Sequence, residues 1–270
     1  MDFGKIEVII FDIDGTLVHK KDSISARLIK QINILKKSGY KVGIATGRSI
    51  AESGSIIDQI KPNFPCIFAD GQLAYDIEKK EVLFKKSLPL DKIELIKVYL
   101  NDDYHVIQED ENYIYAENRL AEIRFSMAFG VNRKFISNTK AEDSILPIRM
   151  YITAKQHKKF ISSDIEEKII MMSEKWIKVY RAGENWIILS LSQKDKVDAL
   201  NAICKKLKLK TSNILAFGDG CNDINLFKSV GISIAMQGAN QTVKRYVDLV
   251  TNDDTTNSIS KILDNLQLYY

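Results

Sequence analysis

Apolar positions along this chain follow two patterns, and together they predict an α/β fold. Residues 8–11 and 213–217 are nearly continuous apolar runs, which are typical of central strands in a parallel sheet covered on both faces. Residues 23–37 carry apolar side chains at helical spacing, and residues 41–46 form the next strand pattern. A strand, a helix and a strand in this order form a βαβ unit, so we predict a Rossmann-like parallel sheet.

The middle of the chain has a different layout. Residues 62–84 indicate short strands around turns, and beyond residue 87 helix patterns alternate with strand patterns. The helices are expected near residues 90–100, 119–129 and 155–172, and the strands near residues 104–108, 112–116, 146–153, 176–180 and 185–190. The βα rhythm resumes only after Gln193. We therefore predict a core formed by residues 1–84 and 191–270, with residues 85–190 as an inserted α+β domain.

Two carboxylates follow the first predicted strand. Asp12 ends the apolar run, and Asp14 stands in a turn with Gly15. Because glycine breaks the strand, the two side chains can take different directions and different roles. One carboxylate could attack phosphorus to form an aspartyl-phosphate, while the other handles the leaving-group proton. A pair of solvated turn aspartates and a Ca²⁺ loop are the alternatives for this motif alone.

A second acidic turn follows the strand predicted at residues 213–217. Its sequence is Gly218-Asp219-Gly220-Cys221-Asn222-Asp223, and its carboxylates are expected to face the end of the first strand. Clustered carboxylates repel one another and raise one another's pKa values unless a cation accompanies them. We therefore expect a divalent metal, and Mg²⁺ suits a site whose ligands are oxygens together with a phosphate group.

Thr46-Gly47 ends the strand predicted at residues 41–46 and precedes a helix pattern over about residues 49–60. A hydroxyl group and unpaired backbone N–H groups at the start of a helix would bind a phosphate oxygen. The alternative is a threonine N-cap beside a tight glycine turn, without any ligand.

Composition limits the classes of function. The 270 residues are 45% hydrophobic and 27% charged, which indicates an ordinary globular protein with one large domain or two. The net charge of +4 is spread along the chain, which argues weakly for an anionic ligand and against nucleic acid. Three scattered cysteines, with no signal peptide and no membrane-length apolar run, predict a cytoplasmic protein with reduced thiols.

These motifs together resemble the haloacid dehalogenase superfamily, and more narrowly its Cof-type phosphatases with a large inserted cap. The resemblance rests on Asp12-Ile13-Asp14-Gly15-Thr16-Leu17, Ala45-Thr46-Gly47-Arg48, Lys196, and Gly218-Asp219-Gly220-Cys221-Asn222-Asp223, in that order. It implies a Mg²⁺-dependent phosphomonoesterase that acts on small phosphorylated metabolites, with residues 85–190 as a cap that sets substrate specificity.

The resemblance also implies a role for each residue. Asp12 would be the nucleophile and a Mg²⁺ ligand. Asp14 would be the general acid/base and lend its backbone carbonyl to the metal. Asp219 would complete the protein's metal ligands, and Asp223 would act close by, directly or through water. The phosphoryl group would be held by Thr46, Gly47, Lys196 and Asn222.

The chain departs from the family pattern at three places. Val197 stands where the family has Gly after its lysine, and Lys194 is close enough to compete with Lys196. Asp70-Gly71 replaces an expected Asn-Gly, and Met236-Gln237-Gly238-Ala239-Asn240 replaces Met-Gly-Asn-Ala. The first departure leaves the identity of the lysine open, and the others could alter substrate contacts or only a loop.

Two other functions remain open. A phosphomutase of the same fold would use the same Asp12 chemistry but yield an isomerised product. A catalytically idle binding or regulatory module would keep the pocket, although the intact acidic set argues against it. The sequence does not identify the substrate: sugar phosphates, pyridoxal phosphate and flavin mononucleotide are all open, and so is the oligomeric state.

Overall fold

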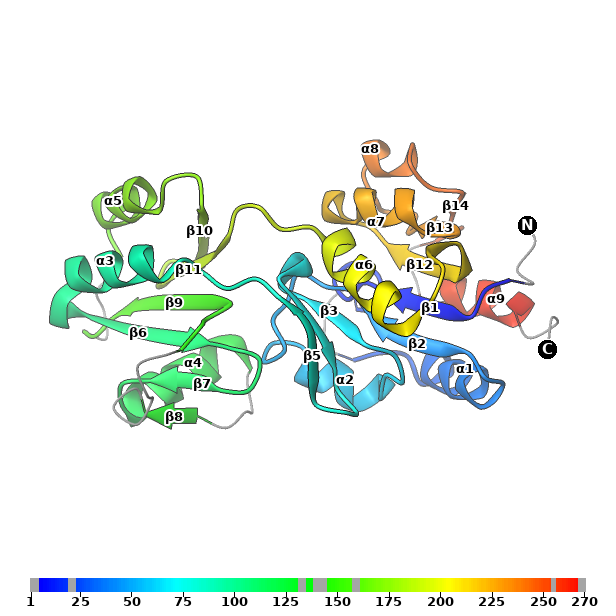
Figure 1. Cartoon of the computed structure of the whole chain (residues 1–270), viewed down its shortest axis with the longest axis horizontal. Helices are drawn as coiled ribbons and strands as arrows, with labels where there is room; N and C mark the ends of the chain where they lie inside the picture. The colour runs from blue at the N-terminus through cyan, green and yellow to red at the C-terminus, as the bar shows by residue number, and fades with distance from the viewer. Residues whose placement is uncertain are drawn as a thin grey trace. The chain divides into compact units, whose positions relative to one another are not determined.

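The chain folds into two compact units (Figure 1). The core unit comprises residues 1–49, 53–84 and 195–270, and the insert unit comprises residues 50–52 and 85–194. Residues 50–52 count with the insert unit because Ala51 lies in one of its buried apolar clusters. The computed structural model describes residues 5–18, 23–130, 135–137, 145–156, 161–253 and 256–266.

A parallel sheet forms the centre of the core unit. Its strands, in spatial order, are β14 (Leu249–Val250), β13 (Ile232–Ala235), β12 (Ile214–Gly218), β1 (Val8–Phe11) and β2 (Lys41–Ile44). All of these neighbours pair in parallel, and every residue of β1 and β12 is buried. The two continuous apolar runs are therefore central strands, and the predicted α/β fold with a parallel core sheet is confirmed.

Helices cover this sheet. They are α1 (Ala26–Lys37), α2 (Gly54–Ile60), α6 (Lys196–Leu207), α7 (Ile224–Ser229), α8 (Gln241–Lys244) and α9 (Thr256–Leu266). Helix α1 begins where Ser25 Oγ accepts a hydrogen bond from the Leu28 N–H at 3.3 Å. Leu200 and Ile203 of α6 belong to the same buried cluster as Ile10 of β1. Burial of these apolar faces explains the helical spacing in the sequence.

Helix α2 starts later than the sequence pattern indicates. The predicted helix over residues 49–60 begins only at Gly54. The reason is that the preceding segment, residues 50–52, is held by the insert unit, where the Ala51 N–H donates to Glu109 Oε1 at 3.1 Å. The expectation that Thr46-Gly47 leads directly into a helix N-terminus is therefore wrong.

A small three-stranded sheet completes the core unit. It consists of β3 (Cys66–Phe68), β4 (Leu73–Asp76) and β5 (Glu81–Lys85), as the short-strand pattern predicted. A 3₁₀ turn, Ala69–Gly71, joins β3 to β4. Ile67 of β3 forms a parallel bridge with Ala45 at the end of β2. This bridge brings the turn close to Thr46.

The insert unit is built on a mixed sheet. Its strands, in spatial order, are β10 (Ile177–Ala182), β11 (Trp186–Leu191), β9 (Arg149–Ala154), β6 (Tyr104–Glu109), β7 (Ile114–Ala116) and β8 (Phe135–Ser137). Only the β7–β8 pair is parallel among the described pairings of this sheet. The sheet and its helices fit the predicted α+β character, although β8 was not predicted.

Helices of the insert unit pack into two separate apolar clusters. Helices α3 (Leu90–Leu100) and α5 (Ser163–Ser173) contribute to one cluster, and α4 (Arg119–Phe129) contributes Phe125 to the other. The bounds of α3 and α4 agree with the prediction. The helix expected from residue 155 instead begins at Ser163, because β9 extends to Ala154 and Ser162 Oγ caps α5. Part of that predicted helix, residues 157–160, lies outside the described residues.

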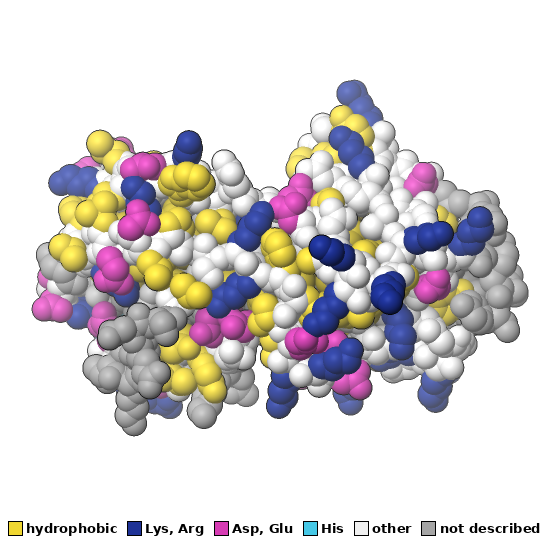
Figure 2. Space-filling view, in the orientation of Figure 1, with side chains coloured by type: hydrophobic (Ala, Val, Ile, Leu, Met, Phe, Trp, Pro, Cys, Tyr) yellow, Lys and Arg dark blue, Asp and Glu magenta, His cyan; other side chains and the backbone are white. Residues whose placement is uncertain are grey.

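The surface carries mixed charge. On the face drawn in Figure 2, Lys and Arg side chains are scattered among acidic and apolar ones. Among the described residues, the most exposed large apolar side chains are Val98 of α3, Met127 of α4 and Met171 of α5. No helix in the described ranges is long and apolar enough to cross a membrane.

Candidate active site

Three acidic side chains meet at the carboxyl ends of β1 and β12. These strands are parallel neighbours, with Phe11 in register with Phe217, so the residues that follow them lie at one edge of the sheet. Asp12 follows β1, while Asp219 and Asp223 follow β12. One carboxylate oxygen from each of the three lies within 4.8 Å of the others. The predicted convergence of the two acidic turns is thus present in the structure.

Lys196 is the lysine that enters this acidic cluster. It is the first residue of α6 and is fully buried. Its Nζ donates to Asp12 Oδ1 at 2.9 Å, to Asp223 Oδ1 at 2.6 Å and to the Ala45 carbonyl at 2.9 Å. Lys194 instead donates to Ser190 Oγ at 2.7 Å, in the insert unit. The structure thus brings Lys196, and not Lys194, to the acidic cluster, and its role toward the phosphate stays a prediction.

Burial makes the charges of this cluster costly. Desolvation raises the pKa of Asp12 to about 8; Lys196 opposes this rise, while Asp223 and Asp219 add to it. Burial alone would lower the pKa of Lys196, but Asp12 and Asp223 hold it well above its ordinary value. Three carboxylates face one ammonium group, so the cluster has an acidic excess. A divalent cation with oxygen ligands fits such a donor set.

Asp223 is fixed by backbone groups of its own turn. Asp223 Oδ2 accepts hydrogen bonds from the Asp219 N–H at 3.2 Å and the Gly220 N–H at 3.0 Å. Asp219 lies against Gly15, where an added Cβ would come within 2.0 Å of Asp219 Oδ2. Gly15 also has a φ of 73°. Only glycine tolerates both the close approach of Asp219 and the positive φ, which explains why the first acidic turn has glycine at position 15.

Asp14 does not belong to the three-carboxylate cluster. Its carboxylate forms a two-point ion pair with Arg48, from Nε to Oδ2 at 2.9 Å and from Nη2 to Oδ1 at 2.6 Å. The Asp14 side chain is 62% exposed, whereas Asp12 is buried. The two carboxylates of the first motif therefore have different surroundings. A contribution of Asp14 to a metal through its backbone carbonyl stays a prediction.

The remaining predicted phosphate-binding residues lie in two loops of the core unit. Thr46 is buried, and its Oγ1 accepts a hydrogen bond from the Arg48 N–H at 3.1 Å. This is a local turn contact and not the expected N-cap, because α2 begins only at Gly54. Asn222 is exposed and donates to Asp70 Oδ1 at 2.7 Å. Sequence reasoning gave no role to Arg48 or Asp70. Two features of the sequence could have indicated them. Arg48 follows Gly47 as in the family motif, and Asp70 replaces the expected asparagine.

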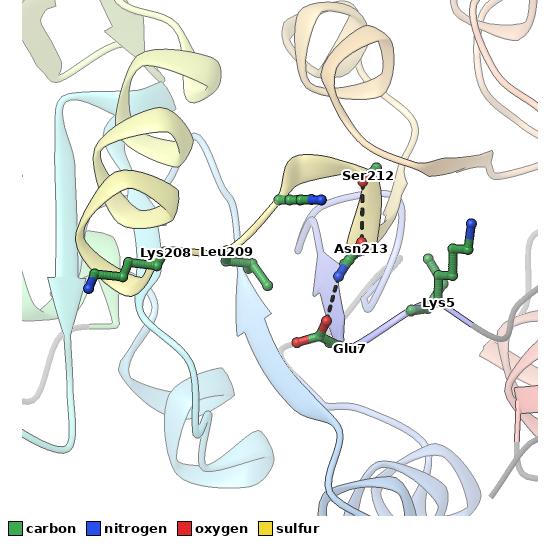
Figure 3. Close-up of a pocket in the computed structure, with 8 residues that line it drawn as sticks. Lys5, Glu7, Lys208, Leu209, Ser212 and Asn213 are labelled. Atoms are coloured by element: carbon green, nitrogen blue, oxygen red, sulfur yellow. Dashed lines mark hydrogen bonds between the residues drawn. The ribbon is translucent and has the colours of Figure 1, made fainter.

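A surface hollow of about 720 Å³ lies at the opposite edge of the core sheet. It is lined by residues that precede β1, including Lys5 and Glu7, and by the segment between α6 and β12, including Lys208 and Asn213. Figure 3 shows Lys5 and Lys208 extending in different directions, while Glu7 is hydrogen-bonded to Asn213. Ligand sites have converging polar groups, so the acidic cluster, and not this hollow, is the candidate active site.

Comparison with protein families identifies the class. The model of haloacid dehalogenase-like hydrolases matches residues 9–263. The chain belongs to this family, and its homologues are Cof-type phosphatases with a cap domain. The predicted family and enzyme class, a phosphatase, are confirmed.

Curated relatives match nearly the whole chain. The pyridoxal phosphate phosphatase of Escherichia coli is 22% identical over 269 residues, covering 95% of this chain and 97% of that protein. The 5-amino-6-(5-phospho-D-ribitylamino)uracil phosphatase of Bacillus subtilis is 24% identical over 263 residues, with 96% and 94% covered. A relative from Streptococcus pyogenes, named for phosphatase and peptidyl-prolyl cis-trans isomerase activities, is longer, and this chain covers 54% of it.

Solved structures share the fold. A haloacid dehalogenase-like hydrolase from Bacteroides thetaiotaomicron superposes with a TM-score of 0.78 at 19% identity, covering 97% of this chain and 99% of that one. The parallel core sheet with an inserted mixed sheet is therefore the architecture of this group of phosphatases.

Proposed function

We propose that the chain is a Mg²⁺-dependent phosphomonoesterase that works through an aspartyl-phosphate on Asp12. The main observation in support of this proposal is the environment of the Asp12 carboxylate. Lys196 binds Asp12 Oδ1, and within the described ranges no donor meets Oδ2. A carboxylate oxygen without a protein donor, on a buried residue beside a buried ammonium group, supports a nucleophilic role rather than a purely structural one.

The acidic excess supports a metal in this mechanism. Asp12, Asp219 and Asp223 would hold Mg²⁺, together with the backbone carbonyl of Asp14. When bound, the ion would neutralise charge on the carboxylates and on the phosphate dianion. Lys196 would remain the protein's own positive charge beside the transferring phosphoryl group, with donors from Thr46, Gly47 and Asn222.

Asp14 is proposed as the general acid/base. Asp12 attacks phosphorus, the bond from phosphorus to the leaving oxygen breaks, and Asp14 gives a proton to the leaving alcohol. Asp14 then takes a proton from the water that attacks the aspartyl-phosphate, which releases inorganic phosphate and restores Asp12. The ion pair with Arg48 holds this exposed carboxylate in one orientation, which supports its part as the base that takes a proton from water.

Substrate selectivity is proposed for the insert unit, predicted as residues 85–190. Relatives named for pyridoxal phosphate and for a phosphorylated ribitylaminouracil support a small phosphorylated metabolite as substrate. Sugar phosphates and flavin mononucleotide belong to the same set of candidates. A phosphomutase remains the alternative within this chemistry, because it would use the same Asp12.

A screen of phosphorylated metabolites tests the proposal. Purified protein with Mg²⁺ should release inorganic phosphate from at least one member of these classes and from p-nitrophenyl phosphate. Excess chelator should remove the activity, and added Mg²⁺ should restore it. An isomerised product without phosphate release would indicate the mutase. Full activity in chelator, or no turnover of any ester with Mg²⁺ present, would contradict the proposed function.

A further inference from the structure

The turn Ala69–Gly71 has an unusual backbone. Its three residues all have positive φ, with 51° at Ala69, 54° at Asp70 and 94° at Gly71. Alanine and aspartate lack the freedom of glycine in this region, so such a run persists only where its surroundings impose it. Strained backbone of this kind concentrates at functional sites. The contacts of the turn show which groups its backbone conformation holds in position.

The turn holds the segment that ends β2. The Asp70 N–H donates to the Thr46 carbonyl at 3.0 Å, and the Ala69 N–H donates to the Arg48 carbonyl at 2.8 Å. Because a peptide group is planar, a fixed carbonyl also fixes the N–H group of the next residue. The turn therefore determines the orientation of the Gly47 N–H, one of the donors proposed for the phosphoryl group.

The Asp70 side chain joins this segment to the second acidic turn. Asp70 Oδ1 accepts a hydrogen bond from Asn222 Nδ2 at 2.7 Å. A Cβ added to Gly47 would come within 2.9 Å of the same oxygen. One carboxylate thus lies against Gly47 and Asn222 together. The amide of Asn222 has two N–H groups, so the bond to Asp70 leaves a second one for a ligand and limits its direction.

Gly71 brings the turn against the start of α6. An added Cβ would come within 2.0 Å of the Asp195 carbonyl oxygen and within 2.7 Å of the Lys196 nitrogen. Asp195 caps α6 by accepting a hydrogen bond from the Val197 N–H at 2.9 Å. The turn therefore contacts all three segments that carry the proposed phosphate-binding residues, and it does so through backbone groups and one carboxylate.

We infer that Ala69–Gly71 is a positioning element of the phosphate site, and that Asp70 is the positioning residue that orients Asn222. This inference rests on the proposed function, since it assigns Asn222 to the phosphoryl group. Asp70 acts through Asn222 and does not touch the reacting atoms. Asparagine could accept the same hydrogen bond through its Oδ1 without the negative charge. Charge and hydrogen bond can therefore be separated by substitution.

Four variants test the inference: Asp70→Asn, Asp70→Ala, Asn222→Ala and the double variant Asp70→Ala/Asn222→Ala. Each is compared with Asp58→Ala, which removes an exposed aspartate of α2. The readouts are kcat and KM for p-nitrophenyl phosphate with saturating Mg²⁺, and calorimetric binding of inorganic phosphate. Circular dichroism and Tm establish that every variant is folded.

Asp70→Ala should lower kcat/KM and weaken phosphate binding by about tenfold, because a misdirected amide loses its bond to the phosphoryl group. Asp70→Asn should bind phosphate at least as tightly as wild type, since it keeps the hydrogen bond and removes a repelling charge. In the Asn222→Ala background, Asp70→Ala should change kcat/KM by less than about twofold, because the residue through which it acts is gone.

Equal losses from Asp70→Ala in both backgrounds would overturn the inference, and so would wild-type behaviour of Asp70→Ala. Tighter phosphate binding by both Asp70 variants would also overturn it, because charge alone would then explain the effect. Wild-type hydrolysis tests the proposed function separately: an active enzyme with unaffected Asp70 variants contradicts only the positioning role. A wild-type protein that neither hydrolyses esters nor binds phosphate contradicts both.

Discussion

Each unit of this molecule contains a buried cluster of charged groups. The core cluster consists of Asp12, Asp219, Asp223 and Lys196. The insert cluster consists of Glu52, Glu109, Arg149 and Tyr151. Both are largely withdrawn from water, and both contain more carboxylates than cationic side chains. They differ in what their carboxylate oxygens contact.

Protein donors occupy both oxygens of Glu109 in the insert cluster. Glu109 accepts from the Ala51 N–H at 3.1 Å and from the Tyr151 hydroxyl at 2.8 Å, while Glu52 pairs with Arg149 at 2.6 Å. Burial raises the pKa of Tyr151 well above its ordinary value, so its hydroxyl keeps the donated proton. Although burial alone would lower the pKa of Arg149, Glu52 holds it above its ordinary value. Both oxygens of Glu109 are therefore satisfied by protein donors without any ligand.

Asp12 of the core cluster differs from Glu109 in this respect. Asp12 Oδ2 has no donor among the described residues, and burial raises the pKa of Asp12 to about 8 despite the adjacent Lys196. This cluster is costly for folding, since a single buried ammonium group faces three clustered carboxylates. Buried charge alone therefore does not mark an active site. The core cluster differs from the insert cluster because its three carboxylates share one ammonium group and one oxygen of Asp12 has no protein donor among the described residues.

The largest effect is expected from Asp12→Asn in the core cluster. Turnover of p-nitrophenyl phosphate should fall by roughly 10⁴-fold, because an amide is a poor nucleophile of nearly the same volume as the carboxylate. Steady-state hydrolysis with Mg²⁺ measures the loss, and circular dichroism should show an unchanged fold. Activity within tenfold of wild type would show that Asp12 is not the nucleophile.

In the insert cluster, Arg149→Met should lower the free energy of unfolding by about 3–5 kcal/mol, because it leaves Glu52 buried without its partner. Urea unfolding of the full chain measures the loss. The matched control is Arg149→Met/Glu52→Gln, which removes both charges and should recover a large part of the stability. A single variant that loses less than about 1 kcal/mol would show that the cluster is not structural.

Asp14→Asn separates the two carboxylates of the first motif. Turnover should fall by about 10²-fold, because the water that hydrolyses the aspartyl-phosphate loses its base. With p-nitrophenyl phosphate the first step needs little acid help, so a burst of phenolate and a phosphate mass gain on Asp12 should precede slow turnover. Asp12→Asn should show neither signal. A label on another residue would contradict the division of roles.

Much of the core cluster could be predicted from sequence because its geometry follows from topology. Two continuous apolar runs, at residues 8–11 and 213–217, predict adjacent central strands. Acidic turns at the carboxyl ends of such strands must then meet at one sheet edge. Glycines in both turns allow the close approach that Gly15 makes to Asp219. Convergence of the carboxylates therefore required no knowledge of side-chain packing.

Contacts between distant side chains could not be predicted in this way. Asp70 and Asn222 are 152 residues apart, and Glu52 and Arg149 are 97 residues apart, with no periodicity that relates them. Lys194 and Lys196 are the same residue type two positions apart, so the sequence alone does not tell which one reaches the acidic cluster. The structure shows that α6 begins at Lys196, after the N-cap Asp195. The late start of α2 likewise depends on contacts of residues 50–52 with the insert unit.

Mg²⁺ should raise the stability of the core cluster and not that of the insert cluster. At a concentration of 100 times its Kd, the ion should add about 2.7 kcal/mol, seen as a rise in Tm. Asp219→Asn should reduce this rise, because it removes a proposed ligand. Glu109→Gln should change the starting Tm but leave the Mg²⁺-dependent rise intact. An equal rise in wild type and Asp219→Asn would contradict the proposed metal site.

The smallest effect is expected where a charged pair is exposed. Arg119 lies at the start of α4 and pairs with Glu122 at 2.6 Å, but the Arg119 side chain is 80% exposed. Arg119→Ala should change the free energy of unfolding by less than about 0.5 kcal/mol. Two effects offset the stability lost with the ion pair. A positive charge at a helix N-terminus is unfavourable, and alanine favours the helix more than arginine does.

Urea unfolding at low and high salt checks this expectation. Screening weakens both the ion pair and the repulsion between Arg119 and the helix dipole, so the difference between Arg119→Ala and wild type should stay small at both salt concentrations. The same measurement on Arg149→Met should retain most of its loss in high salt, since buried charges are screened less. A loss above about 1 kcal/mol for Arg119→Ala would mean that pair geometry, rather than burial, decides which charges this fold needs.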